Sequence, residues 1–126
     1  MELRGIIPAM VTPLREDESV NIEELRNQVN RQIKAGAAAL FCLGTNGEFY
    51  ALSQEEKRLV MRTVAEENNG RLPILAGTGC ITTKETIELT KYAKELGYDA
   101  VSVIAPYFAE CSQGTLLQHY TEIADA

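Results

Sequence analysis

Four short segments of this chain combine glycine, hydroxyl or aromatic residues, and each follows an apolar run. They are Thr12-Pro13, Gly44-Thr45-Asn46-Gly47-Glu48, Gly77-Thr78-Gly79-Cys80 and Pro106-Tyr107-Phe108. In the second segment, glycines on both sides of Thr45 and Asn46 permit a tight turn with consecutive exposed backbone N–H groups. Such a nest favours a carboxylate or phosphate oxygen, and Thr45 adds a hydroxyl that can pass or receive a proton. The alternative is that these glycines only make short strand-to-helix turns, which explains residues 77–79 better than residues 44–48.

Other reactive residue types have structural interpretations. Glu48 is expected to accept backbone hydrogen bonds rather than to act as a base. His119 falls within an expected helix, where a surface or packing role fits best. Cys42 lies in an apolar run and is expected in the core. Neither Cys80 nor Cys111 has a histidine partner nearby in sequence, which argues against a thiol nucleophile.

Apolar runs and amphipathic stretches alternate four times along the chain, which predicts an α/β fold. The expected strands are residues 5–11, 37–43, 72–76 and 100–104. The helices between and after them are expected to begin at the capping residues Asn21, Ser53, Thr82 and Ser112 or Thr115, with Leu116, Tyr120 and Ile123 buried on the last one. Continuous apolar runs such as residues 37–43 are typical of parallel strands covered by helices on both faces.

The capping residues recur about every 30 residues, the size of one strand–helix–strand step. Parallel strands with right-handed crossovers follow, either in an open sheet or in a closed barrel. In both architectures ligands bind beyond the carboxyl ends of the strands. The four polar segments are therefore expected to meet at one edge of the sheet.

Composition narrows the classes of protein to consider. The chain has 126 residues, 45% of them hydrophobic and 24% charged, with a net charge of −6, which fits one soluble globular domain over residues 1–126. The negative charge argues against nucleic acid or an anionic membrane as partner. One histidine without ligand-like spacing argues against a metal site. Three cysteines without a CxxC pair, and no apparent signal peptide, suggest the cytoplasm.

The order and spacing of the four segments resemble the dihydrodipicolinate synthase / N-acetylneuraminate lyase family over essentially the whole chain. That resemblance implies a TIM (β/α)8 barrel, with this chain as its first four strand–helix units. It implies a Schiff-base aldolase or lyase that needs no cofactor and acts on pyruvate, or a related 2-oxo acid, and an aldehyde. By the same resemblance, Gly44, Thr45, Asn46 and Gly47 bind the substrate carboxylate, while Thr45 and Tyr107 are catalytic proton-relay residues.

Two residues depart from the synthase pattern. Asn46 stands where that pattern usually has a second threonine. Phe108 stands where it has a tyrosine that reaches into the neighbouring subunit. Because phenylalanine cannot relay a proton, a sibling aldolase acting on a sugar-acid-like or other 2-oxo acid fits at least as well.

The family's Schiff-base lysine belongs to strand six, beyond the four units found here. The lysines at 34, 57, 84, 91 and 94 fall on expected helices or their caps and are expected to face solvent. The first hypothesis is therefore the N-terminal half of an aldolase, whose bare sheet edges favour a homo-oligomer or docking with a missing C-terminal half-barrel. The alternative is a non-catalytic half-barrel that acts as a binding or assembly module. A nucleotide-binding sheet is disfavoured because GxGxxG and GxxxxGK[ST] motifs are absent.

Overall fold

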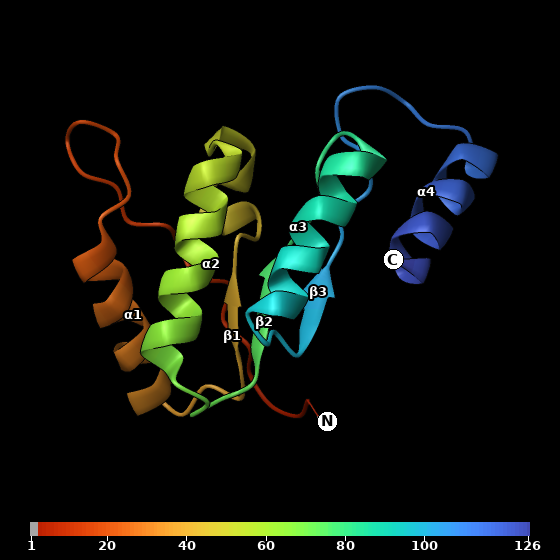
Figure 1. Ribbon diagram of the computed structural model, residues 1–126. Helices are drawn as coiled ribbons and strands as arrows, with labels where there is room; N and C mark the ends of the chain where they lie inside the picture. The colour runs from red at the N-terminus through yellow and green to blue at the C-terminus, as the bar shows by residue number, and fades with distance from the viewer. Residues whose placement is uncertain (1–2) are drawn as a thin grey trace.

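Residues 3–126, which the computed structural model describes, alternate three short strands with four helices (Figure 1). The strands are β1 (Leu40–Cys42), β2 (Ile74–Gly77) and β3 (Ala100–Ser102). The helices are α1 (Ile22–Lys34), α2 (Gln54–Asn68), α3 (Thr83–Glu95) and α4 (Gln113–Asp125), and two single 3-10 turns, η1 (Thr45–Gly47) and η2 (Phe49–Ala51), lie between β1 and α2. The predicted α/β alternation is confirmed.

The strands form one parallel sheet in the order β1-β2-β3, with α1, α2 and α3 on one side of it (Figure 1). Since side chains alternate between faces along a strand, the register separates two sets. Leu40 and Cys42 of β1 are buried on the helix side, whereas Phe41 between them is only half-buried on the other side. The helices therefore build the core on one face and leave the opposite face open.

The first predicted strand, residues 5–11, is not a regular strand, and this prediction is corrected. Only Ala9 forms a parallel bridge, to Phe41, with the Met10 N–H donating to the Phe41 carbonyl at 2.9 Å. Pro8 has no N–H to donate, which removes one bond of a regular ladder. The segment still lies beside β1 in the parallel direction, where a barrel's first strand belongs.

Side-chain caps begin all four helices at the predicted residues, Asn21, Ser53, Thr82 and Ser112. Ser53 and Glu56 form a complete capping box. At Asn21 a capping box is only half formed: Asn21 accepts the Glu24 N–H at 3.1 Å, but the Glu24 carboxylate accepts from Arg31 and Asn27 instead.

Helix α4 packs against α3 through a narrow contact. His119 and Ile123 are buried, and His119 Nδ1 lies 2.8 Å from Thr83 Oγ1. The packing role expected for His119 is confirmed. Leu116 and Tyr120 were expected to be buried with Ile123, but Leu116 is only half-buried and Tyr120 is 39% exposed, because α3 covers only one side of α4.

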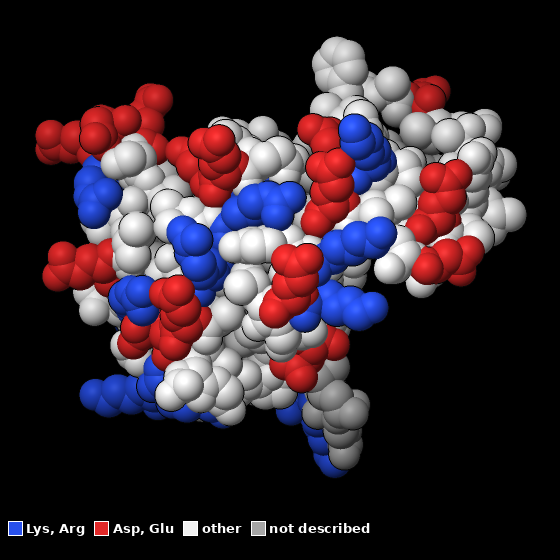
Figure 2. Space-filling view, viewed as in Figure 1, with Lys and Arg blue, Asp and Glu red and all other residues white. Residues whose placement is uncertain are grey.

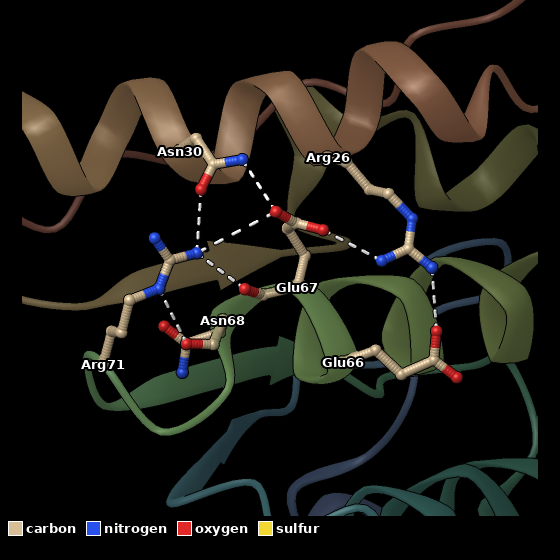
Figure 3. Close-up of polar contacts among 6 residues, drawn as sticks. All are labelled: Arg26, Asn30, Glu66, Glu67, Asn68 and Arg71. Carbon is tan, nitrogen blue, oxygen red and sulfur yellow. Dashed lines mark hydrogen bonds and ion pairs between the residues drawn. The ribbon is translucent and has the colours of Figure 1, made fainter.

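A polar cluster joins α1 to α2 outside the core (Figure 3). At its centre Glu67 accepts hydrogen bonds from Arg26 Nη1 at 2.9 Å and from Asn30 Nδ2 at 2.7 Å. Arg71 Nη2 donates to Asn30 Oδ1 at 2.8 Å, and Arg26 also pairs with Glu66. The bonds from Arg26 and then Asn30 lower the pKa of Glu67 below its usual value. On the face shown in Figure 2, positive and negative side chains are interspersed over much of the helical surface.

We predict that Glu67→Ala lowers the melting temperature by about 3–5 °C, because Glu67 connects two helices. Glu66→Ala, one residue away on the same helix, is the matched control and should change it by about 1 °C or less, since that carboxylate forms one exposed pair. The folded pKa of Glu67 is depressed, so its contribution is complete above the unfolded pKa of about 4.3 and is lost as pH falls through the folded value. Calorimetric melts at pH 7 and pH 3 test this; equal effects of the two variants at pH 7 would contradict it.

Candidate active site

The loop after β1 forms a single tight turn with unused backbone donors. Within η1, the Gly47 N–H donates to the Gly44 carbonyl at 2.9 Å and the Glu48 N–H to the Thr45 carbonyl at 3.0 Å. The N–H groups of Thr45 and Asn46 open this turn, and no residue of the described part of the chain accepts them. Both side chains are exposed. The turn thus presents two consecutive N–H groups and one hydroxyl to solvent, an arrangement that suits an anion.

Left-handed backbone conformations lie on both sides of this turn. Leu43 has φ 58° and Glu48 has φ 53°, and neither is glycine. Leu43 is also buried, at 1% exposure, so its side chain is fixed in the core while its backbone is strained. Such conformations cost about 1–3 kcal/mol each and persist only where surrounding contacts impose them. Strain of this kind is concentrated at binding and catalytic sites.

Three neighbouring contacts impose the turn. Thr12 Oγ1 donates a buried hydrogen bond of 2.7 Å to the Gly47 carbonyl. A Cβ on Gly47 would lie 3.1 Å from the Met10 carbonyl oxygen, so only glycine packs here without displacement. A Cβ on Gly77 would clash with the Leu43 carbonyl oxygen. The segment before α1, the loop after β1 and the end of β2 therefore lock together through one threonine and two glycines.

A cavity of about 250 Å³ opens beside the turn, at the carboxyl ends of the strands. Its wall includes Gly44 and Thr45 after β1, Gly77 and Gly79 at the end of β2, and Ser102 at the end of β3. The Thr78 N–H donates to the Ser102 carbonyl at 3.1 Å, which continues the pairing of β2 with β3 past the regular strands. The prediction that the polar segments meet at one edge is thus supported for the loops after β1 and β2 and for Thr12.

The predicted site residues do not all face this cavity. Gly44 and Thr45 line it. Asn46 is exposed at the outside of the turn, and Gly47 is buried against Thr12. Tyr107 lies elsewhere: its ring packs edge-to-face on Phe49 with centroids 5.5 Å apart. From the sequence, Tyr107 was expected at the site because it follows the last strand. Nothing in the sequence indicated that its ring packs on Phe49 instead of lining the cavity.

The pKa of the Tyr107 hydroxyl is raised although this side chain does not line the cavity. Partial burial raises its pKa first, and the nearby Cys80 and Glu85 raise it further. The side chain is 41% exposed, and Phe108 beside it is 90% exposed. Phe108 therefore projects from the molecule, and neither aromatic side chain lines the cavity.

Lys57 corrects the expectation that every lysine faces solvent. Its side chain is only 5% exposed and its Nζ lies 5.7 Å from the centre of the Phe49 ring, a cation–π geometry. The lysines at 34, 84, 91 and 94 are exposed on helices as expected. None of the five lines the cavity.

None of the cysteines lines the cavity either. Cys42 is in the core, as predicted, and burial raises the pKa of its thiol to about 11, with the nearby Tyr98 hydroxyl acting in the opposite direction. Cys80 is buried and accepts a hydrogen bond from Gln54. Between residues 3 and 126 there is no group of three His, Cys, Asp or Glu side chains placed to hold a metal ion. No helix in that range is long and apolar enough to cross a membrane.

The sequence pattern did not indicate Ser102 as a site residue, and it did not indicate the structural role of Thr12. Strand alternation places Ser102 on the same face of the sheet as Ala100. Which face this is becomes clear only from the pairing of β3 with β2, which the sequence does not show. Thr12 was noted as part of a polar segment, yet its role as an anchor for Gly47 depends on two segments 35 residues apart.

The model of the dihydrodipicolinate synthetase family matches residues 2–126. A 4-hydroxy-tetrahydrodipicolinate synthase of Alcanivorax borkumensis is 44% identical over 124 residues, covering 98% of this chain and 42% of that protein. A solved dihydrodipicolinate synthase of Acinetobacter baumannii, complexed with pyruvate, superimposes with a TM-score of 0.95 at 42% identity, covering 99% of this chain and 43% of that one. An N-acetylneuraminate lyase of Mycoplasma synoviae superimposes with a TM-score of 0.94 at 40% identity, covering 98% and 43%. The chain therefore spans less than half the length of the proteins it matches.

We predict that Thr12→Val destabilises the fold by about 1–3 kcal/mol, because valine has nearly the same shape but leaves the buried Gly47 carbonyl without a donor. Thr12→Ser is the matched control: it keeps the hydroxyl, loses one methyl group and should cost about 1 kcal/mol or less. Urea unfolding at equilibrium measures both. A Thr12→Val variant as stable as Thr12→Ser would show that the bond does not hold the turn.

Proposed function

The chain belongs to the dihydrodipicolinate synthetase family, and on that premise we propose that it supplies the 2-oxo acid carboxylate-binding side of a Schiff-base aldolase or lyase. The reaction condenses pyruvate, or a related 2-oxo acid, with an aldehyde, or cleaves the corresponding product. The observation that supports this proposal is the strained turn at residues 44–47, which presents the free N–H groups of Thr45 and Asn46 beside the Thr45 hydroxyl. Its location at the carboxyl ends of parallel strands agrees with where barrel enzymes place their chemistry.

The proposed carboxylate contact uses backbone donors because they are fixed in place. A carboxylate oxygen accepts the Thr45 and Asn46 N–H groups, while Gly44 lets the ligand approach the backbone closely. Gly47 contributes indirectly, since its bond to Thr12 holds the turn. A 2-oxo acid bound this way directs its ketone into the cavity, next to the Thr45 hydroxyl.

Thr45 is the proposed proton-relay residue. Schiff-base chemistry requires protons to move as a ketone becomes an iminium and then an enamine. The Thr45 hydroxyl lines the cavity and has no hydrogen-bond partner among residues 3–126, so it is free to donate and accept there. Tyr107 is the second proposed relay residue. Its hydroxyl lies outside this chain's own cavity, so this role requires contact with the cavity of another chain.

The amine that captures the ketone is proposed to come from outside residues 3–126. Lys57 is buried beneath Phe49, and the other four lysines lie on the outer helices, away from the cavity. Pyruvate is the favoured 2-oxo acid because the Acinetobacter baumannii relative was solved in complex with it. On the family's pattern we also propose a cytoplasmic location, which the three free cysteines support.

We further propose that the open face of the sheet is covered by more protein, either in a homo-oligomer or by further strand–helix units that close a barrel. Phe41 and Leu75 are only half-buried there, and Ile104 is 44% exposed. The outer edge of β3 also leaves backbone donors and acceptors unpaired. Sedimentation velocity should therefore detect self-association of the 126-residue chain, and a single monomeric species at all concentrations would contradict this.

We predict that Thr45→Val weakens pyruvate binding about five-fold, because it removes the hydroxyl that lies next to the ketone and one net hydrogen bond is worth about 1 kcal/mol. Thr45→Ser keeps the hydroxyl and should bind within about two-fold of the unaltered chain. Thr121→Val, a threonine on the far helix α4, is the surface control. Isothermal calorimetry measures all four proteins, and equal affinities for Thr45→Val and Thr45→Ser would contradict the assigned contact.

Borohydride added with pyruvate provides a second measurement on the same samples. The lysine positions predict that mass spectrometry finds no reduced adduct on this chain. An adduct on any of its five lysines would overturn the assignment of the amine to a region outside residues 3–126. Pyruvate binding without any turnover, even after assembly with a lysine-bearing partner, would favour the non-catalytic binding module instead.

A further inference from the structure

Two residues with hydroxyl side chains line the cavity, and the proposed function uses only one of them. Of the eight residues that line the cavity, only Thr45 and Ser102 have polar side chains. Thr45 follows β1, whereas Ser102 ends β3, two strands away in the sheet. Neighbouring strands lie about 4.8 Å apart, so about 10 Å separates the two strands. A small ligand held at Thr45 therefore points its other end towards Ser102.

Ser102 lies on the inner face because of its register. It pairs with Gly77 across the parallel β2–β3 ladder, and both residues line the cavity. The hydrogen bond from the Thr78 N–H to the Ser102 carbonyl fixes the backbone at this point. The side chain is exposed, and its hydroxyl has no partner among residues 3–126. A free hydroxyl at this level is unusual, since bulky branched side chains dominate the inner layers of such barrels.

Two glycines let neighbouring groups pack closely into the wall of the cavity beside Ser102. Gly77 pairs with Ser102, and a Cβ on it would clash with the Leu43 carbonyl. Gly79 allows Ile104 to close the wall, since a Cβ at residue 79 would lie 2.7 Å from Ile104 Cγ2. The far end of the cavity thus offers one polar group, the Ser102 hydroxyl, in an otherwise apolar or side-chain-free wall.

We propose that Ser102 is a specificity-determining residue that selects 2-oxo acids with a hydroxyl on C3. This inference rests on the proposed function, because the carboxylate must first be held at residues 44–47. The Ser102 hydroxyl then exchanges a hydrogen bond with the C3 hydroxyl of the acid. An acid with a methyl group at that position displaces water from the Ser102 hydroxyl without replacing its hydrogen bond, and that loss lowers its affinity.

Two pairs of matched molecules test the contact. Hydroxypyruvate and 2-oxobutanoate have the same number of heavy atoms and differ by a hydroxyl against a methyl group. Ser102→Thr and Ser102→Val likewise share a shape and differ in the same way, so any packing effect of the added methyl group appears in both variants. Calorimetry of each acid with each variant and with the unaltered 126-residue chain forms a double-mutant cycle.

The expected result is a preference for hydroxypyruvate of about five-fold in the unaltered chain and in Ser102→Thr, as one net hydrogen bond predicts. Ser102→Val should lose this preference while its affinity for pyruvate, which has no C3 hydroxyl, changes by less than about two-fold. A preference that persists in Ser102→Val, or an unaltered chain that favours 2-oxobutanoate, overturns the proposal.

The outcomes separate this proposal from the one it rests on. If pyruvate binds and depends on Thr45, but no preference between the matched acids exists, only the role of Ser102 falls. If the unaltered chain binds none of the three acids, the carboxylate site itself is wrong, and Ser102 falls with it.

Discussion

The strained turn between Leu43 and Glu48 is the constraint on which the rest of the site depends. Two non-glycine residues in left-handed conformations bracket a turn in which the N–H groups of Thr45 and Asn46 are free. That geometry persists because Thr12 binds Gly47 and because Gly77 leaves room for the Leu43 carbonyl. A carboxylate ligand would meet donors that are already oriented, so little ordering cost remains at binding. Every functional role assigned here presupposes this fixed backbone.

The fold supplies that constraint through an asymmetric sheet. Helices α1 to α3 bury one face, and the polar cluster centred on Glu67 ties α1 to α2 from outside (Figure 3). The opposite face retains Phe41 and, above it, the cavity. Stability is therefore concentrated on the helix side, while the carboxyl ends of the strands can hold small residues and strained backbone at limited cost. This division matches the general separation of stability and catalysis in barrels.

The helix starts and the positions of the regular strands could be predicted from sequence because they depend on residues close together in the chain. The caps at Asn21, Ser53, Thr82 and Ser112 were correct because a capping side chain acts within three residues of its target. Gly36 and Gly97 adopt left-handed conformations just after α1 and α3, as is typical of glycines that follow a helix. The predictions for residues 37–43, 72–76 and 100–104 located the three regular strands, but each prediction was longer than the strand and the one for β2 ended one residue early. The predictions were too long because apolar residues continue beyond the ladder hydrogen bonds.

Long-range geometry accounts for what could not be predicted. Residues 5–11 do not form a regular strand because Pro8 cannot donate a ladder hydrogen bond. They still lie parallel to β1. The sequence around Lys57 is that of an exposed helical lysine. Its burial depends on the ring of Phe49, eight residues earlier, which its sequence pattern does not indicate. Tyr107 was placed at the site by its position after a strand, but its ring packs on Phe49 instead. Ser102 was missed because its direction depends on how β3 pairs with β2. The structure therefore supports Thr45 as a residue of the proposed site and adds Ser102 to it.

Amide NMR shifts during a titration with pyruvate test the central claim most directly, with pyruvamide as the control ligand. Pyruvamide has nearly the same shape but replaces the carboxylate with a neutral amide. If the turn binds the carboxylate, pyruvate shifts the Thr45 and Asn46 N–H signals most, and pyruvamide leaves them nearly unchanged. Equal shifts with both ligands, or the largest shifts at residues remote from 44–47, would contradict the account.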